Sequence, residues 1–360
     1  MQSPFRRGSY AGAIALPSPG LPNSRSARRL PPLTPCRENV NGDVVHGASI
    51  FAPAGAPADA IQTLSLFVLE ITGIIFVIVG GLMVYCLVRY RRRSDDDGRE
   101  PPQVYGSNPV ELAWTVVPII IVFVLTTTAI RSTYEIQAAP PPPDSLQVRV
   151  VGHQWWWEFQ YPALGVITAN ELHIPVSDPA HPTPTYLTLE SADVAHSFWV
   201  PRLAGKTDVI PNRRNIMWLA PAQSGTYVGQ CAEFCGTQHA KMLLRVVVHP
   251  ADDFARWVQA QRQPAARNPG AEAGRQVFEA TACVSCHAVR GTGASGTFGP
   301  DLTHLMSRET IGAGAAQNDL ANLRDWVEDP NRLKPGVLMP AMQLTQPQLD
   351  QVVSYLASLR

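Results

Sequence analysis

The chain has 360 residues, a formal net charge of zero and 45% hydrophobic residues. A balanced charge excludes nucleic-acid binding driven by bulk electrostatics, and this length predicts two or three domains. Two close pairs account for four of the six cysteines, and the other two are Cys36 and Cys86. This distribution favours metal or haem sites over a disulfide framework.

Residues 1–60 are rich in Pro, Gly, Ser and Arg and show no apolar periodicity. We therefore expect a disordered or processed segment, or the product of an overextended start codon. The apolar piece from Tyr10 to Leu16 is too short for a signal sequence. Cys36 is a candidate for lipid modification of a bacterial N-terminus, but Pro35 directly before it argues against lipidation.

Residues 61–135 contain two apolar runs, at 61–88 and 110–130, each long enough for a helix to cross a membrane. Two buried helices of a soluble domain are the alternative, which the missing amphipathic spacing disfavours. The cationic cluster Arg89–Arg93 follows the first run. Because such clusters stay on the cytoplasmic side, everything after residue 135 is predicted to lie outside a bacterial plasma membrane. Glu111 opens the second run and suits an interfacial carboxylate.

Residues 144–250 follow the stiff spacer Pro140–Pro143 and are predicted to form a β-sandwich. Short runs rich in Val, Leu and Thr lie at 146–151, 186–189 and 243–248. Apolar and polar residues partly alternate in these runs, which is typical of half-buried strands. Several short strands without intervening helices favour two packed sheets of the Greek-key type.

The segment from Cys231 to Met242 carries the most informative chemistry. Its two thiols, the His239 imidazole and a thioether are soft ligands suited to copper. Cys231 and Cys235 can bridge two metal ions, and His196 on an upstream strand supplies a second imidazole. The alternative is a disulfide between the two cysteines with incidental His and Met.

A second motif, Cys283-Val-Ser-Cys286-His287, is the attachment signal for c-type haem, in which both thiols bond the haem and the histidine ligates iron. Alone, it also fits a zinc half-site or a redox pair. Residues 252–267 are predicted to form a helix within a linker at 251–270. Residues 271–360 then form an all-α domain, in which Met339 or Met342 completes the iron coordination and raises its potential.

The last helix of this domain begins with the capping-box pattern Thr345-Gln-Pro-Gln348. Its predicted buried face packs near Phe278 and consists of Leu349, Val352, Val353 and Leu356.

Residues 152–250 resemble the copper domain of cytochrome c oxidase subunit II. The matching pieces are Gly152-His-Gln-Trp-Trp-Trp-Glu-Phe-Gln-Tyr161, Ser191-Ala-Asp-Val-Ala-His196, Gly205-Lys-Thr-Asp-Val-Ile-Pro211 and Gly229-Gln-Cys-Ala-Glu-Phe-Cys-Gly236. Together with the haem motif, residues 60–360 resemble subunit II of a bacterial caa-type oxidase with a fused cytochrome c. Asn212 departs from the family's usual glycine but tolerates left-handed angles.

The resemblance implies a cupredoxin fold and a dinuclear purple copper centre, CuA. Its implied ligands are Cys231, Cys235, His196, His239, Met242 and the backbone carbonyl of Glu233. The Glu233 carboxylate would reach a magnesium ion shared with subunit I. The family's Pro-Gly-x-x-Met spacing selects Met339 over Met342, and the Pro300 carbonyl would orient the haem histidine.

The resemblance also assigns two roles outside the ligand sets. Trp155 would lie exposed above the copper and receive the incoming electron, although core packing also explains a tryptophan there. Trp155 and Trp157 share one face of the expected strand, and Trp156 takes the other. Glu111 would stand at the cytoplasmic mouth of a proton path into subunit I.

The implied function is that of the subunit through which electrons enter a respiratory cytochrome c oxidase. An outside donor, such as a c-type cytochrome or a quinol-oxidising complex, would reduce the haem, and electrons would pass through copper to subunit I. Oxygen reduction and proton translocation would occur there, and subunit III is a further expected partner. No nucleic acid is expected.

Two alternatives remain open at this point. The first is the corresponding subunit of a copper-containing nitric oxide reductase, and the second is a membrane-tethered copper-delivery protein. Nitrous oxide reductase shares the copper loop but needs a His-rich cluster domain that nine scattered histidines do not supply.

Overall fold

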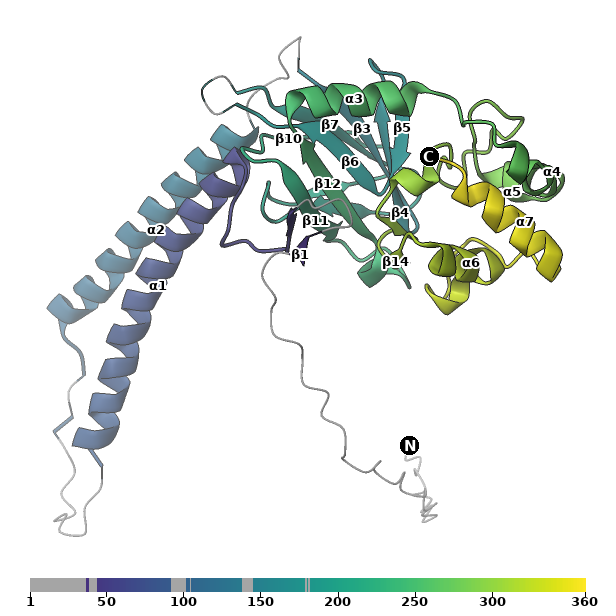
Figure 1. Ribbon diagram of the computed structural model, residues 1–360. Coiled ribbons are helices and arrows are strands. Elements are labelled where there is room, and N and C mark those ends of the chain that lie inside the picture. The colour runs from purple at the N-terminus through teal and green to yellow at the C-terminus, as the bar shows by residue number, and fades with distance from the viewer. Residues whose placement is uncertain are drawn as a thin grey trace, which may run out of the picture. The chain divides into compact units, whose positions relative to one another are not determined.

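Figure 1 shows the computed structural model of the chain, which describes residues 37–38, 44–91, 102–103, 105–137, 145–178, 180 and 182–360. Several expectations lie outside the described residues. They are most of the segment 1–60 with Cys36, the arginines Arg92 and Arg93, and the spacer Pro140–Pro143.

Two long apolar helices, α1 (Ala56–Arg89) and α2 (Asn108–Gln137), form the predicted hairpin and run side by side (Figure 1). Both are long and apolar enough to cross a membrane. Their large apolar side chains are exposed on most sides, which suits hydrocarbon rather than a protein core. Pro118 lies inside α2, a position that membrane helices tolerate. The predicted helix hairpin is confirmed.

Two sheets form the β-sandwich, whose strands follow the hairpin in the chain except for β1 and β2, which precede it. One sheet contains β1 (Arg37–Glu38), β2 (Val44–His46), β6 (Glu171–Pro175), β8 (His196–Trp199), β9 (Thr207–Val209), β11 (Gly225–Cys231) and β12 (Leu243–His249). The other runs in the order β10 (Asn215–Leu219), β7 (Thr185–Ser191), β3 (Gln147–His153), β4 (Trp156–Tyr161) and β5 (Val166–Ala169).

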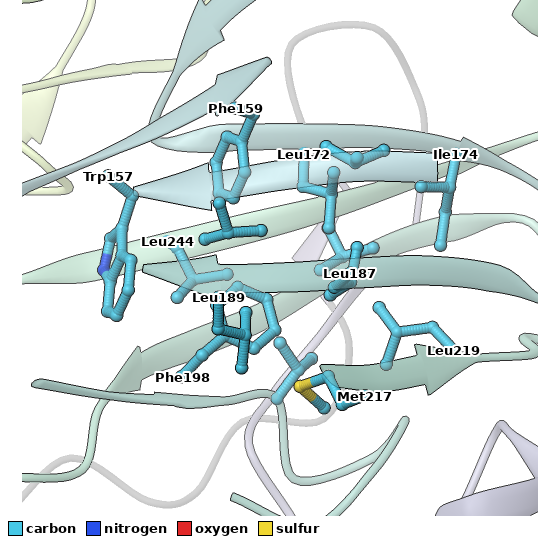
Figure 2. Packing of buried hydrophobic residues seen from close by; sticks show 14 of the residues in the cluster. Trp157, Phe159, Leu172, Ile174, Leu187, Leu189, Phe198, Met217, Leu219 and Leu244 are labelled. Atoms are coloured by element: carbon cyan, nitrogen blue, oxygen red, sulfur yellow. The ribbon is translucent and has the colours of Figure 1, made fainter. Parts of the chain in front are cut away.

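Apolar side chains from both sheets meet in one core (Figure 2). Alternate residues of β4 point inward, so that Trp157 and Phe159 are fully buried, and Leu187 and Leu189 do the same from β7. Trp157 packs edge-to-face on Phe198 with 5.6 Å between ring centroids. This sandwich confirms the predicted cupredoxin-type fold.

Residues 44–60 depart from the expected disordered segment. Strand β2 pairs in parallel with β11, and the next residues run along the sandwich. Ala54 donates its N–H to the Arg202 carbonyl at 2.7 Å, and Gly55 forms a bridge with Pro221. A side chain on Gly55 would lie 2.9 Å from the Leu203 oxygen, so this close approach requires glycine. These pairings are long-range, which explains why local composition does not reveal them.

The helix α3 (Ala251–Arg262) belongs to the sandwich rather than to a free linker. Val258 joins the core, and Trp257 stacks on His173 with 4.3 Å between ring centroids. The helix ends at Arg262, earlier than the predicted Arg267, and Arg262 donates to the Leu164 carbonyl at 2.7 Å.

The C-terminal domain has a separate core built by helices and a short hairpin. Its elements are α4 (Glu272–Ala280), α5 (Cys283–Cys286), β13 (Thr310–Ile311), β14 (Ala316–Gln317), α6 (Leu320–Glu328) and α7 (Gln346–Ala357). The predicted capping box of α7 and its buried face are confirmed. Phe278 lies 5.5 Å from Tyr355 between ring centroids, as expected.

Helices α4 and α7 cross at Gly274, where an added Cβ would lie 1.9 Å from the backbone oxygen of Gln351. Gly274→Ala should therefore push the helices apart and cost about 1–3 kcal/mol of stability in this domain. Hydrogen exchange of the α4 and α7 amides in the full chain measures the loss. Gly293→Ala is the control, since its Cβ would meet nothing within 4 Å. Equal exchange in both variants would contradict the close crossing.

Candidate copper centre and haem pocket

The ligand loop, residues Cys231 to Met242, is closed at its base by the hairpin of β11 and β12. Gln230 pairs with Leu243, and the Cys231 N–H donates to the Met242 carbonyl at 3.0 Å. The two ends of the loop are therefore fixed next to each other. His196 reaches the same place from the start of β8, whose residue Phe198 pairs with Cys231.

Two buried thiols lie at the centre of this site. Their Sγ atoms, in Cys231 and Cys235, are 3.8 Å apart, and both cysteines are free. A disulfide would need about 2.05 Å, so this arrangement differs from the disulfide alternative. A metal–thiolate bond is roughly 2.3 Å long, so one metal ion can contact both sulfurs and a second ion can do the same from the opposite side.

Further donors surround the two sulfurs. Cys231 Sγ lies 3.9 Å from His196 Nδ1 and 3.2 Å from the carbonyl oxygen of Glu233. Cys235 Sγ lies 3.7 Å from His239 Nδ1 and 3.8 Å from Met242 Sδ. Each sulfur therefore has one imidazole and one weaker donor beside it. This soft donor set fits two copper ions.

The two thiols titrate as a pair. The hydrogen bond shared with Cys235 lowers the pKa of Cys231 to about 3, and the same neighbour raises the pKa of Cys235. One thiolate forms readily, whereas a second negative charge 3.8 Å away is costly without a cation. Bound metal cations remove that cost, since coordination deprotonates both thiols.

Asp193 orients the His196 ring, a role that the sequence analysis did not assign. His196 Nε2 lies 2.8 Å from Asp193 Oδ1, which leaves Nδ1 directed at Cys231. The Gln154 N–H donates to Asp193 Oδ2 at 2.6 Å and fixes the carboxylate. Burial alone would raise the pKa of Asp193, but these hydrogen bonds lower it, so the carboxylate stays charged. The sequence feature that could have indicated this role is a carboxylate three residues before a candidate copper ligand.

Trp155 lies in the two-residue turn between β3 and β4, where His153 pairs with Trp156. Its indole Nε1 donates to the Cys235 carbonyl at 2.9 Å. Gly236, at φ +113°, leaves room for the indole, because an added Cβ would lie 3.0 Å from Trp155 Cζ2. Trp155 is only 7% exposed, so the expectation that it lies exposed was wrong. It packs with the core of the copper domain and also lines a cavity shared with the C-terminal domain.

A cavity of about 220 Å³ lies between Trp155 and the C-terminal domain. The haem motif lines it through Cys283, Cys286 and His287, and both candidate methionines, Met339 and Met342, also line it. The rest of the wall is mostly apolar. Thiols, an imidazole and thioethers converging on one apolar cavity fit a covalently attached haem.

The Pro300 carbonyl lies 2.8 Å from His287 Nδ1, which leaves Nε2 facing the cavity. Burial lowers the pKa of His287 and keeps the imidazole neutral, the form that binds iron. Gly299 makes this packing feasible, since an added Cβ would lie 2.6 Å from His287 Cε1.

The two remaining predicted residues lie at exposed positions. Glu233 is exposed on the ligand loop next to Phe234, which is 77% exposed. Glu111 lies in the first turn of α2 and accepts the Ser107 N–H at 3.3 Å. An acidic residue there complements the helix dipole. Neither position conflicts with the role expected for it, and both roles stay predictions.

Three family models match consecutive parts of the chain. The transmembrane domain of cytochrome c oxidase subunit II matches residues 45–131, its periplasmic domain matches residues 179–249, and cytochrome c matches residues 271–360.

Curated relatives match nearly the whole chain. Cytochrome c oxidase subunit 2 of Alkalihalophilus pseudofirmus is 35% identical over 315 residues, which cover 86% of this chain and 90% of the relative. The subunit 2 of Bacillus sp. strain PS3 is 35% identical over 332 residues, covering 87% and 91%. Among solved structures, the periplasmic domain of subunit II from Bradyrhizobium japonicum is 29% identical, with a TM-score of 0.32. It covers 34% of this chain and 97% of that chain.

The fold and the site define a membrane-anchored electron-transfer protein with a copper domain followed by a cytochrome c domain. The chain belongs to the cytochrome c oxidase subunit 2 family. It is a member with a C-terminal cytochrome c domain, as the resemblance implied, and its cofactors are copper and haem.

Asp193→Asn should weaken copper binding by about 10-fold, within the range found when a hydrogen-bond partner of a metal ligand is lost. Asparagine has a single carboxamide oxygen, so it cannot accept hydrogen bonds from both the Gln154 N–H and His196 Nε2, and one of the two contacts is lost. Competition with a copper chelator measures the affinity. Asp208→Asn, on the exposed face of the neighbouring β9, is the matched control. Equal affinity in both variants would contradict the orienting role.

Proposed function

We propose that this chain is the subunit through which electrons enter a respiratory cytochrome c oxidase. When bound, a c-type haem and a dinuclear copper centre supply one-electron redox chemistry that links an outside donor to subunit I. Oxygen is reduced in subunit I, coupled to proton translocation. The observation that carries this proposal is that one residue, Trp155, both lines the haem cavity and bonds the copper ligand loop.

In the proposed copper centre, Cys231 and Cys235 bridge the two ions. His196 and His239 are the terminal ligands, and Met242 and the Glu233 carbonyl complete the coordination. The short distances from the two sulfurs to these donors support the assignment. His196 and Met242 are fully buried, which would limit movement of the ligands between oxidation states and keep the reorganisation barrier small.

In the proposed haem site, Cys283 and Cys286 form the thioether bonds and His287 ligates iron. Met339 is the proposed sixth ligand because it follows Pro335-Gly336 with the family's spacing, and Met342 is its alternative. A methionine ligand raises the iron potential, as an electron carrier requires.

Trp155 is the proposed contact between the two centres. Electron tunnelling falls steeply with distance and proceeds better through bonds than through space. The hydrogen bond from Trp155 Nε1 to the Cys235 carbonyl provides a route of this kind. Because Trp155 is buried at the wall of the haem cavity, an outside donor delivers its electron to the cytochrome c domain instead.

The remaining parts of the proposal concern the partners and the membrane. Arg89 and Arg91 follow the first span, so the positive-inside rule puts the copper and haem domains on the periplasmic side. The exposed Glu233 carboxylate is proposed to reach a magnesium ion shared with subunit I, and Glu111 to open a proton path there. A c-type cytochrome or a quinol-oxidising complex is the proposed donor, and subunit III a further partner.

The relatives favour this function over the alternatives. Two relatives that match nearly the whole chain are named cytochrome c oxidase subunit 2, and two others, which match 61% of it, are named quinol oxidase subunit 2. None of these four is named as a nitric oxide reductase subunit. Buried ligands in a closed loop suit retained copper, whereas a copper-delivery protein needs an exchangeable site.

The proposal is tested on the complex purified from membranes, with Trp155→Phe against Trp156→Phe. Trp155→Phe loses the hydrogen bond to the Cys235 carbonyl. Electron transfer from haem to copper should therefore slow by more than ~10-fold, equivalent to roughly 1.4 kcal/mol of barrier. Flash reduction of the haem measures the transfer rate, and oxygen uptake measures turnover. The absorption spectra of the haem and the copper centre should stay unchanged. Trp156 lines the same cavity but stacks on His153 rather than bonding to the copper loop, so its variant should keep the rate. A complex that consumes nitric oxide rather than oxygen would overturn the function.

A further inference from the structure

Lys334 is a buried lysine with no role in the electron path described above. The chain contains three lysines, Lys206, Lys241 and Lys334. The Lys334 side chain is only 1% exposed, and lysine is almost never fully buried unless its charge is paired. Its position therefore requires an explanation from its partners.

Those partners are two backbone carbonyls in different domains. Lys334 Nζ donates to the Trp155 oxygen at 2.7 Å and to the Gly312 oxygen at 2.8 Å. Trp155 lies in the turn of the copper domain, and Gly312 directly follows β13 in the cytochrome c domain. The amine thus joins the two domains at the wall of the shared cavity.

The chain around Lys334 also contacts the copper ligand loop. Lys241 Nζ donates to the Leu333 carbonyl at 2.9 Å, and Gln238 Nε2 donates to the Pro335 carbonyl. Residues 333–335 therefore contact both the Trp155 turn and the loop that holds the copper ligands. The same stretch continues to Met339, so its position also affects the haem pocket.

A second group of contacts holds the β13–β14 hairpin against the sandwich. Glu171 accepts the Glu309 N–H at 2.7 Å, and Arg245 lies 3.2 Å from the Glu309 carboxylate. The Leu243 N–H donates to the Ala313 carbonyl at 3.0 Å. Gly312 therefore belongs to a segment that is already docked, and Lys334 connects it to Trp155.

The hydrogen bonds of Lys334 do not require one protonation state. Burial lowers the pKa of Lys334 to about 7; Cys235 opposes this shift and Lys241 adds to it. The ammonium group has three N–H donors and the neutral amine has two. Either form can donate to both carbonyls.

We propose that the Lys334 side chain, with the carbonyls of Trp155 and Gly312, is an interdomain latch that holds the haem pocket against the turn beside the copper loop. Lys334 is a positioning residue, since it acts on electron transfer through Trp155. The inference rests on the proposed function, because the latch serves electron transfer only if electrons pass from haem to copper.

The first test needs no substitution. The full chain, loaded with copper and haem, is treated with an amine-reactive reagent, and labelling of the three lysines is followed by mass spectrometry. Lys206 and Lys241 are exposed and should react rapidly. Lys334 should react roughly 10-fold more slowly or less, because the reagent reaches it only when the domains separate. Equal labelling of Lys334 and Lys241 would overturn the latch.

The second test compares Lys334→Met with Lys206→Met in the purified complex. Methionine keeps much of the side-chain volume but leaves two buried carbonyls without this donor. Haem-to-copper electron transfer should slow by roughly 10-fold or more, because the rate falls with the docked fraction. Proteolysis of residues 263–268, between α3 and the cytochrome c domain, should quicken in the same variant. Lys206→Met removes an exposed charge and should change neither quantity.

The outcomes separate the latch from the function. Unchanged transfer and unchanged proteolysis in Lys334→Met would overturn the latch and leave the electron path intact. Absence of haem-to-copper transfer in the unsubstituted complex would instead overturn the proposed function. If Lys334→Met fails to load haem, the labelling rate of the unsubstituted chain still decides the inference.

Discussion

Two sulfur atoms held 3.8 Å apart in a buried loop are the constraint on which the rest of the structure depends. The β11–β12 hairpin fixes both ends of that loop, and β8 brings His196 to it. The sandwich core keeps these strands in place and so holds the donors in a fixed arrangement. This preorganisation explains why a β-sandwich with short loops, rather than a flexible segment, carries the site.

Fusion of the two redox domains changes how electrons reach the copper. A tethered cytochrome c domain has a high effective concentration at its target, so docking need not be strong. Here Trp155 is part of the wall of a cavity that the copper domain shares with the docked domain. Hydrogen bonds from Trp155 and Gln154 to the Cys235 carbonyl then connect that wall to the copper loop.

The parts of this arrangement that could be predicted from the sequence are those made by residues close in the chain. Cys231 to Met242 and Cys283 to His287 are such segments, and the capping box of α7 is another. The partners of Lys334 and the cavity beside Trp155 could not be predicted, because both arise from contacts between domains. The pairing of β2 with β11 and the packing of α3 depend likewise on distant partners.

Electron paramagnetic resonance of the copper-loaded chain tests the central claim most directly. One unpaired electron shared between two sulfur-bridged copper ions should give hyperfine splitting from both nuclei, with copper analysis finding a pair of ions for each haem. A spectrum with splitting from a single copper nucleus, and one ion for each haem, would contradict the account.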